Sequence, residues 1–363
     1  MQRRSFLAAP IGAAAARGAT AAAPIVQANG DGIHHTPAEY ARLLQKLSTT
    51  IEPDSYSVGG VVAKLEASVA AALGKETAVW LSTGTLANHL AVRLLAGDRR
   101  RVLVQQESHL FNDCGDCCQT LSGLHLVPLA PGKATFTVED LEREAERGAS
   151  GRVAVPIGAI QIETPVRRKT GEAFDLAEMK RVCQWARDRK IGLHLDGARL
   201  YLAAAYSGVP VREYAALFDT VYISMYKYFN AASGAILAGP RSLLENLLHP
   251  RRMFGNGLSH VWPFAAVALH FFEGFGERYA RAVVTSEKVI AALQTDSRFQ
   301  VTRVPNGTNI FFLGVKGADE QVFQRKAQEA GFILPAANAG RFTVQVNETW
   351  ARATPQEILS RLA

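Results

Sequence analysis

The chain has 363 residues, of which 48% are hydrophobic, and its formal net charge is +7. This length and apolar content are enough for one large domain and a smaller one. The positive charge is moderate and forms no basic stripe with interleaved aromatic residues, so we expect no nucleic-acid partner. No apolar run approaches the length that a bilayer requires, so we expect no membrane partner.

The first residues have the pattern of an export signal. Twin arginines at Arg3 and Arg4 precede a run rich in alanine and glycine, and residues 19–21 (Ala-Thr-Ala) offer a small-residue cleavage site. This pattern is typical of the twin-arginine route. We therefore predict a signal peptide over residues 1–23 and an exported protein, periplasmic or secreted. The alternative is a disordered alanine-rich extension on a cytoplasmic protein.

The rest of the sequence alternates apolar runs with amphipathic segments, which predicts an α/β fold. We expect an N-terminal arm over residues 24–50, a large domain over 51–258, and linking helices with a small α+β domain over 259–363. Large-domain strands are predicted at residues 77–81, 102–105, 124–129, 154–162, 191–195, 220–225 and 235–238. Helices are predicted at residues 38–47, 61–73, 138–146, 174–189 and 240–248.

Small residues with hydroxyl groups follow the strand predicted at residues 77–81. The segment reads Ser82-Thr83-Gly84-Thr85 and opens a helix. Backbone N–H groups and the helix dipole attract a phosphate at such a place, and the hydroxyl groups add donors. The segment therefore predicts an anion site, although Ser and Thr are also common as ordinary helix caps.

Three of the four cysteines lie close together, at Cys114, Cys117 and Cys118. On a helix, this spacing would place all three on one face. A metal site would want a fourth ligand, for which His109 and His125 are only loosely placed, and an exported protein could form a disulfide here. Packing of small apolar thiols on a buried helix face is the simplest interpretation, and we predict no metal site.

A carboxylate and an amine follow two of the predicted strands. The apolar run 191–195 ends at Asp196, and the run 220–225 leads to Lys227. In open α/β sheets, ligands bind at this edge. Pyridoxal phosphate (PLP) needs both groups, because a lysine forms a Schiff base with its aldehyde and a carboxylate keeps its pyridine nitrogen protonated. A turn-capping aspartate and a surface lysine are the alternative, which Arg199 and the aromatic neighbours of the lysine disfavour.

These residues resemble those of a known family. His194-Leu195-Asp196-Gly197-Ala198-Arg199, followed by a Ser-x-x-Lys segment, is similar to the threonine aldolase/β-eliminating lyase family of PLP enzymes. The pattern Thr-Gly-Thr-x-Ala-Asn that starts at Thr83 matches a second motif of that family. The resemblance implies the aminotransferase-like fold (fold type I), with a mostly parallel sheet of the seven-stranded type. It also implies a PLP cofactor, an amino-acid substrate, and a homodimer or homotetramer with shared active sites.

The resemblance also implies roles for individual residues. Lys227 would bind PLP covalently, Asp196 would pair with its ring nitrogen, and His109 would stack on its ring and carry protons. The other cofactor-binding residues would be Thr83, Gly84, Thr85, Arg199 and Arg252, the last of which reaches the neighbouring subunit's phosphate. The substrate-binding residues would be Asp31, Tyr56 and Arg341, and Arg341 would clamp the α-carboxylate.

The chain also departs from threonine aldolases. They carry a histidine for proton transfer at the β-hydroxyl, and this chain has none between Glu163 and Gly171. Gly30 replaces a carboxylate-binding serine, and aromatic residues replace the glycines around Lys227. We predict a PLP-dependent lyase that cleaves the Cα–Cβ bond of a β-hydroxy-α-amino acid, with water or another histidine such as His35 as the base. β-Elimination, racemisation or transamination, and amino-acid binding without turnover, are the alternatives.

Overall fold

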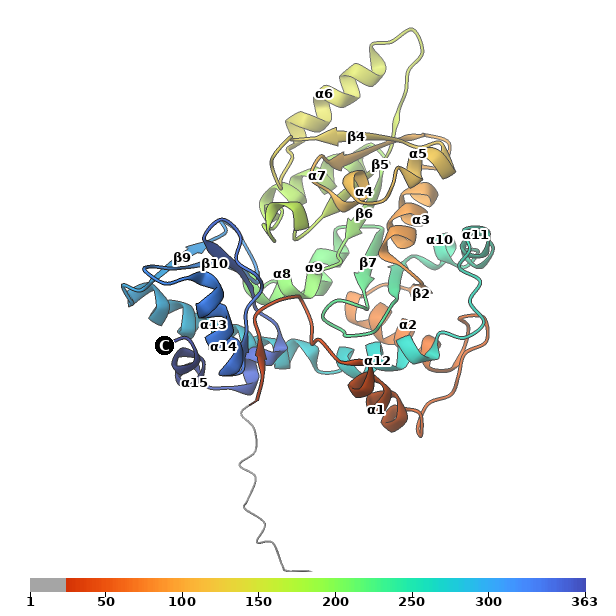
Figure 1. Ribbon diagram of the computed structural model, residues 1–363. Helices are drawn as coiled ribbons and strands as arrows, with labels where there is room; N and C mark the ends of the chain where they lie inside the picture. The colour runs from red at the N-terminus through yellow and green to blue at the C-terminus, as the bar shows by residue number, and fades with distance from the viewer. Residues whose placement is uncertain (1–23) are drawn as a thin grey trace, which may run out of the picture.

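In the computed structural model, which describes residues 24–363, a seven-stranded sheet lies at the centre of the larger part of the molecule (Figure 1). In spatial order its strands are β2 (Thr77–Leu81), β8 (Ala235–Gly239), β7 (Thr220–Ser224), β6 (Gly192–Asp196), β5 (Ile157–Glu163), β3 (Arg101–Gln105) and β4 (His125–Leu129). Six of the strands run in one direction, and β8 runs in the opposite direction. The predicted mostly parallel sheet is confirmed. The signal peptide predicted over residues 1–23 lies outside the described residues.

Helices cover both faces of this sheet, which is why every residue of β5, β7 and β8 is buried. One core is formed with α2 (Gly60–Leu73), α6 (Val138–Ala149), α7 (Leu176–Asp188), α8 (Leu200–Ser207), α9 (Val211–Ala216) and α12 (Trp262–Phe272). The opposite face packs on α3 (Gly84–Ala96), α4 (His109–Asn112), α5 (Cys117–Ser122) and α10 (Arg241–Leu244). The single helix predicted over residues 240–248 is instead divided between α10 and α11 (Leu248–Met253).

A three-stranded antiparallel sheet forms the smaller C-terminal part. Its strands, in spatial order, are β12 (Arg341–Gln345), β10 (Ile310–Val315) and β9 (Phe299–Arg303), and they pack with α14 (Glu320–Glu329) and α15 (Pro355–Arg361). The helix α13 (Phe275–Thr295) joins the two parts, because Tyr279 lies in the large core whereas Leu293 lies in the small one. No helix within residues 24–363 is long and apolar enough to cross a bilayer.

The N-terminal arm connects the two parts a second time. Its strand β1 (Val26–Gln27) pairs in parallel with β11 (Phe332–Ile333) of the smaller part. The arm then crosses to the larger part and continues into α1 (Pro37–Leu47), which lies beside α12 (Figure 1). Thr36 and Glu39 form a capping box that fixes the start of α1. The arm is thus held at both ends, and the residues between cross the edge of the large sheet.

The cysteine prediction needs a correction. The helix α5 begins at Cys117, and Cys114 lies before it in the turn that follows α4. The three thiols therefore do not share one helix face. The turn has a physical reason, because Gly115 and Asp116 both adopt left-handed backbone angles, which an α-helix does not allow. Cys114 and Cys118 are buried in the core on the α3 face of the sheet.

Candidate active site

The residues proposed for the cofactor meet at one edge of the large sheet. Asp196 ends β6, opposite Tyr222 of β7, and Lys227 lies three residues beyond the end of β7. Because β8 is antiparallel to both β2 and β7, β2 runs in the same direction as these strands. Thr83 follows β2, and His109 follows β3, at the same edge. Ligands of open α/β proteins bind at the carboxyl ends of the strands.

The carboxylate of Asp196 is held in a single orientation. Only 1% of the residue is exposed. Asn88 Nδ2 donates to its Oδ2 at 2.6 Å, and the backbone N–H of Ala198 donates to its Oδ1 at 3.1 Å. A buried carboxylate that accepts a hydrogen bond on each oxygen cannot rotate without losing one of them.

Lys227 lies near several charged groups. Burial removes water from around the Lys227 amine, and this desolvation lowers its pKa to about 8. The positive charge of Arg199 adds to the effect. The Lys227 ammonium also lies 4.9 Å from the centre of the Tyr226 ring. The amine is therefore available in its neutral, nucleophilic form at a lower pH than a lysine in water.

The N-terminal arm brings Asp31 to this site. Arg199 Nε donates to Asp31 Oδ2 at 2.8 Å, and both side chains are largely buried. The arm is fixed beside Lys227 because the backbone N–H of Ile33 donates to Asn230 Oδ1 at 2.7 Å. A Cβ atom at Gly32 would lie 2.3 Å from the carbonyl oxygen of Lys227, so only glycine allows this close approach.

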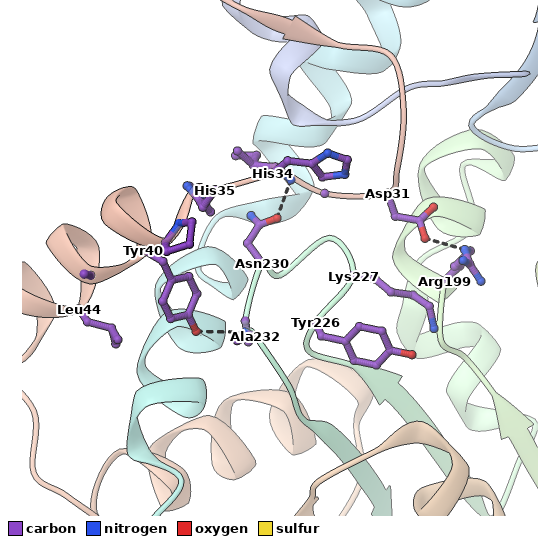
Figure 2. A pocket seen from close by; sticks show the side chains of 15 residues that line it. Asp31, His34, His35, Tyr40, Leu44, Arg199, Tyr226, Lys227, Asn230 and Ala232 are labelled. Carbon is purple, nitrogen blue, oxygen red and sulfur yellow. Dashed lines mark hydrogen bonds and ion pairs between the residues drawn. The ribbon is translucent and has the colours of Figure 1, made fainter. Parts of the chain in front are cut away.

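A cavity of about 720 Å³ opens beside these residues (Figure 2). The ion pair of Asp31 and Arg199 lies at one end, next to Lys227 and Tyr226. The opposite end is formed by the arm, α1 and the chain after Lys227, through His34, His35, Pro37, Tyr40, Ala41, Leu44, Ala231 and Ala232. The cavity therefore combines a charged end with a wall that is largely apolar and aromatic.

The segment predicted to bind an anion starts a helix. The Thr83 side chain caps α3 by accepting from the N–H of Leu86 at 3.2 Å. A Cβ atom at Gly84 would lie 2.1 Å from the Tyr222 hydroxyl, so Tyr222 and α3 approach as closely as glycine permits. Asn256 accepts from the N–H of Ser82 at 2.7 Å, and its buried Nδ2 has no partner among residues 24–363. An unpartnered donor beside a helix N-terminus fits a phosphate.

His109 and Glu163 are linked at the same edge. The backbone N–H of His109 donates to Glu163 Oε2 at 2.5 Å. A hydrogen bond with the Cys114 thiol raises the pKa of His109, and the charge of Asp196 adds to this effect. Burial, with the charge of Asp196 adding, raises the pKa of Glu163. Glu163 therefore positions the loop that carries His109.

Three of the predicted residues lie elsewhere. Tyr56 is 50% exposed, and the guanidinium of Arg252 lies 5.2 Å from the centre of its ring. Arg341, at the start of β12, is exposed, and its guanidinium lies 4.0 Å from the centre of the Phe312 ring. Of the predicted site residues, Asp31, Arg199 and Lys227 line the cavity. Asp196, His109 and Thr83 lie at the sheet edge beside it, whereas Tyr56, Arg252 and Arg341 make the contacts just described. Their roles stay predictions.

Tyr40 and Asn230 are cavity residues that the sequence did not reveal. Tyr40 accepts a hydrogen bond from the backbone N–H of Ala232 at 3.0 Å, which ties α1 to the chain after Lys227. Asn230 holds the arm. The one available signal was that Asn230 follows Lys227 by three residues, and an asparagine near a lysine carries little information.

Comparison with known proteins assigns the chain to a family. A family model described as beta-eliminating lyase matches residues 36–315. The chain belongs to the beta-eliminating lyase family. The resemblance noted in the sequence is thereby confirmed, and so are the aminotransferase-like fold and the PLP cofactor.

Individual proteins similar to this chain share less than a third of its residues. An alanine racemase from Cochliobolus carbonum is 29% identical over 79% of this chain and 76% of that protein. A low-specificity L-threonine aldolase from Eremothecium gossypii is 26% identical over 86% of this chain and 82% of that protein. A solved structure from Listeria monocytogenes, provisionally assigned as an L-allo-threonine aldolase, is 27% identical over 94% of each chain, with a TM-score of 0.74.

The residues at the sheet edge fit PLP. Lys227 offers an amine with a lowered pKa, and Asp196 offers a fixed carboxylate for a ring nitrogen. The start of α3, with the unpartnered Nδ2 of Asn256, offers donors for a phosphate. These three features meet, in that order, what the aldehyde, the pyridine nitrogen and the phosphate of PLP each require.

Proposed function

We propose that this protein is a PLP-dependent lyase that cleaves the Cα–Cβ bond of a β-hydroxy-α-amino acid to give glycine and an aldehyde. The carrying observation is that Lys227, Asp196 and Arg199 come together at one sheet edge beside the cavity. An amine, a carboxylate and a guanidinium in this arrangement suit a cofactor that holds an amino acid and accepts its electrons. The similarity to an L-threonine aldolase supports the Cα–Cβ bond as the one that breaks.

The proposal assigns each residue a task. Bound PLP supplies an electron sink for the bonds of the substrate's α-carbon. Lys227 holds the cofactor and returns a proton to the α-carbon of the product. Asp196 keeps the ring nitrogen protonated, and the ion pair with Asp31 fixes the Arg199 guanidinium beside the site. For Arg341 to clamp the α-carboxylate, its side chain must leave Phe312 and turn toward the cavity.

His35 is our candidate for the proton at the β-hydroxyl. It lines the cavity, and burial lowers its pKa. The imidazole is therefore neutral at neutral pH, which is the form that accepts a proton. In this proposal, His35 reaches the substrate from the N-terminal arm and replaces the histidine that is missing between Glu163 and Gly171.

Racemisation is the second candidate. The observation that favours it is the similarity to an alanine racemase over 79% of this chain. The missing histidine points the same way, because removal of the α-proton needs no base at the β-hydroxyl. Lys227 is again the proton carrier in this reaction, so both candidates use the same central residue.

Product analysis separates them. The PLP-loaded protein is incubated with L-threonine, L-allo-threonine and L-alanine, and the products are identified by mass and by chiral separation. We expect glycine and acetaldehyde from one or both threonines. D-Alanine from L-alanine would replace the lyase proposal with racemisation, and 2-oxobutyrate with ammonia from threonine would replace it with elimination.

The pH dependence of cofactor attachment tests the assignment of Lys227. Only the neutral amine attacks an aldehyde, and burial lowers the pKa of Lys227 to about 8. We expect the rate of covalent PLP attachment to the apoprotein to rise through about pH 8 and then level off. Stopped-flow absorbance measures this rate. A rate that still rises steeply near pH 10, as for a lysine in water, would contradict the assignment.

Assembly and export also stay proposals. Tyr56 and Arg252 lie together on an exposed surface, and we propose that they complete a neighbouring subunit's site in a homodimer or homotetramer. Analytical ultracentrifugation checks this assembly, and a monomer at micromolar concentration would contradict it.

We propose export by the twin-arginine route from Arg3 and Arg4, which cell fractionation of an Arg3→Lys, Arg4→Lys variant checks.

A further inference from the structure

A chain of buried polar side chains leads to Asp196 from the start of β7. Thr220 Oγ1 lies 2.8 Å from His194 Nδ1, and His194 Nε2 lies 2.8 Å from Asn88 Oδ1. Asn88 Nδ2 then donates to Asp196 Oδ2 at 2.6 Å. None of the four residues is more than 1% exposed, so each polar atom depends on these partners.

The spacing of His194 and Asp196 explains how one strand supplies both residues. They are two residues apart in β6, so their side chains point to the same face of the sheet. That face packs on α3, which carries Asn88, whereas Leu195 between them points into the opposite core. The histidine of the His-Leu-Asp sequence is therefore placed beside the aspartate's own hydrogen-bond partner.

Only one arrangement of protons satisfies the whole chain. Because the amide nitrogen of Asn88 donates to the carboxylate, its oxygen must accept, so His194 Nε2 carries a proton. Burial lowers the pKa of His194 to about 4, so its ring is neutral and Nδ1 accepts from the Thr220 hydroxyl. Every donor in the chain then points toward Asp196.

This order has a consequence for Asn88. An amide oxygen and nitrogen have nearly the same shape, so the position of Asn88 alone does not decide which of them faces Asp196. The Asp196 carboxylate can only accept, so the amide nitrogen faces it, and the amide oxygen then accepts from a protonated His194 Nε2. Loss of the His194 imidazole would remove the donor to that oxygen and, with it, one of the two contacts that hold the amide in this orientation.

We infer that Thr220, His194 and Asn88 are positioning residues that orient the Asp196 carboxylate for the PLP ring nitrogen. The inference rests on the role proposed for Asp196 but not on which reaction the protein catalyses. Thr220, His194 and Asn88, which we call the relay, are all neutral. The relay therefore acts through orientation and adds no charge. The charged and titratable groups whose pKa the charge of Asp196 affects are His194, Glu163, His109, Arg199, Lys227, Tyr222 and Tyr226.

A neighbouring histidine provides a matched control. His89 follows Asn88 on α3 and is 2% exposed, and burial lowers its pKa to about 4 as well. Its Nε2 lies 2.6 Å from Ser122 Oγ, which leads away from Asp196. Loss of His89 therefore removes a buried neutral imidazole with a hydroxyl partner but leaves the relay intact.

The test compares His194→Leu, His194→Gln and His89→Leu. PLP is titrated into each apoprotein to obtain its dissociation constant, and the pH midpoint of the bound cofactor's visible band is recorded. We expect His194→Leu to weaken PLP binding about tenfold, the size of one hydrogen bond to a charged group, and to displace the pH midpoint. His194→Gln keeps a donor for Asn88 and should recover most of both, while His89→Leu should match the wild type.

Two outcomes would overturn the inference. One is wild-type PLP affinity and pH midpoint in His194→Leu, and the other is an equal change in His89→Leu, which would indicate a general packing effect. If His194→Leu does not fold, Thr220→Val removes only the hydroxyl that holds the imidazole tautomer, and a smaller change in the same direction is expected. Affinity and midpoint do not depend on the reaction, so failure of the relay and failure of the lyase proposal are distinguishable.

Discussion

Lys227→Ala should abolish covalent PLP binding and lower the turnover of any amino-acid substrate by about 10²–10⁴-fold, the usual contribution of a positioned proton-transfer group. Two tasks are lost together, because the same amine anchors the cofactor and moves the proton at the α-carbon. Mass spectrometry of the intact protein after reduction with borohydride measures attachment, and a coupled assay measures turnover. The protein should still fold, because the side chain lies at the wall of a cavity.

Lys75→Ala is the matched control for this change. Burial lowers the pKa of Lys75 too, and its Nζ donates to the carbonyl oxygen of Phe218 at 2.5 Å. It precedes β2, so it lies at the edge of the sheet opposite Lys227. We expect full PLP attachment in this control. If Lys227→Ala retained covalently bound PLP and wild-type turnover, the site and the proposed function would both be wrong.

Asp196→Asn should lower kcat/KM by about 10²–10³-fold, as does the loss of one preorganised electrostatic contact in other enzymes. Asparagine has the size of aspartate but no charge, so a ring nitrogen beside it would not stay protonated and PLP would accept electrons poorly. One amide hydrogen would also face either Asn88 or the backbone N–H of Ala198, both of which donate to the carboxylate. The visible spectrum of the bound cofactor and the steady-state rate together measure the effect.

Asp219→Asn controls for the loss of an acidic group between the same two strands. Asp219 accepts from the backbone N–H of Leu193 at 2.8 Å, at the end of β6 opposite Asp196. Its replacement should leave the spectrum and the rate unchanged. An Asp196→Asn protein with a wild-type rate and spectrum would show that another group protonates the ring nitrogen, and the relay through His194 would then lose its purpose.

Local signals in the sequence were sufficient for the strands of the large sheet and for the places of Asp196 and Lys227. Apolar runs that stop at Asp196, or just before Lys227, predicted β6 and β7 to within a residue or two, because buried parallel strands are continuously apolar. Thr83 as the cap of α3 followed from the same kind of local pattern. Since the carboxyl ends of parallel strands share one edge, the sequence order of strands and polar residues also predicted that these groups would meet.

Other features depend on contacts between residues that are far apart in the sequence. The pairing of β1 with β11 brings Asp31 to Arg199, the hydroxyl of Tyr222 explains Gly84, and His194 meets Asn88 only because β6 packs on α3.

The sequence alone therefore determined the large-sheet strands and the start of α3, because burial and capping leave periodic or adjacent patterns in a chain. It also determined the cofactor class, through Asp196, Lys227 and the family motifs around them. Tertiary structure alone decided that the arm covers Lys227 and that Arg252 lies against Tyr56. The physical reason is that a hydrogen bond or a close approach between distant segments depends on the packing of whole elements, and it leaves no periodic pattern in either segment.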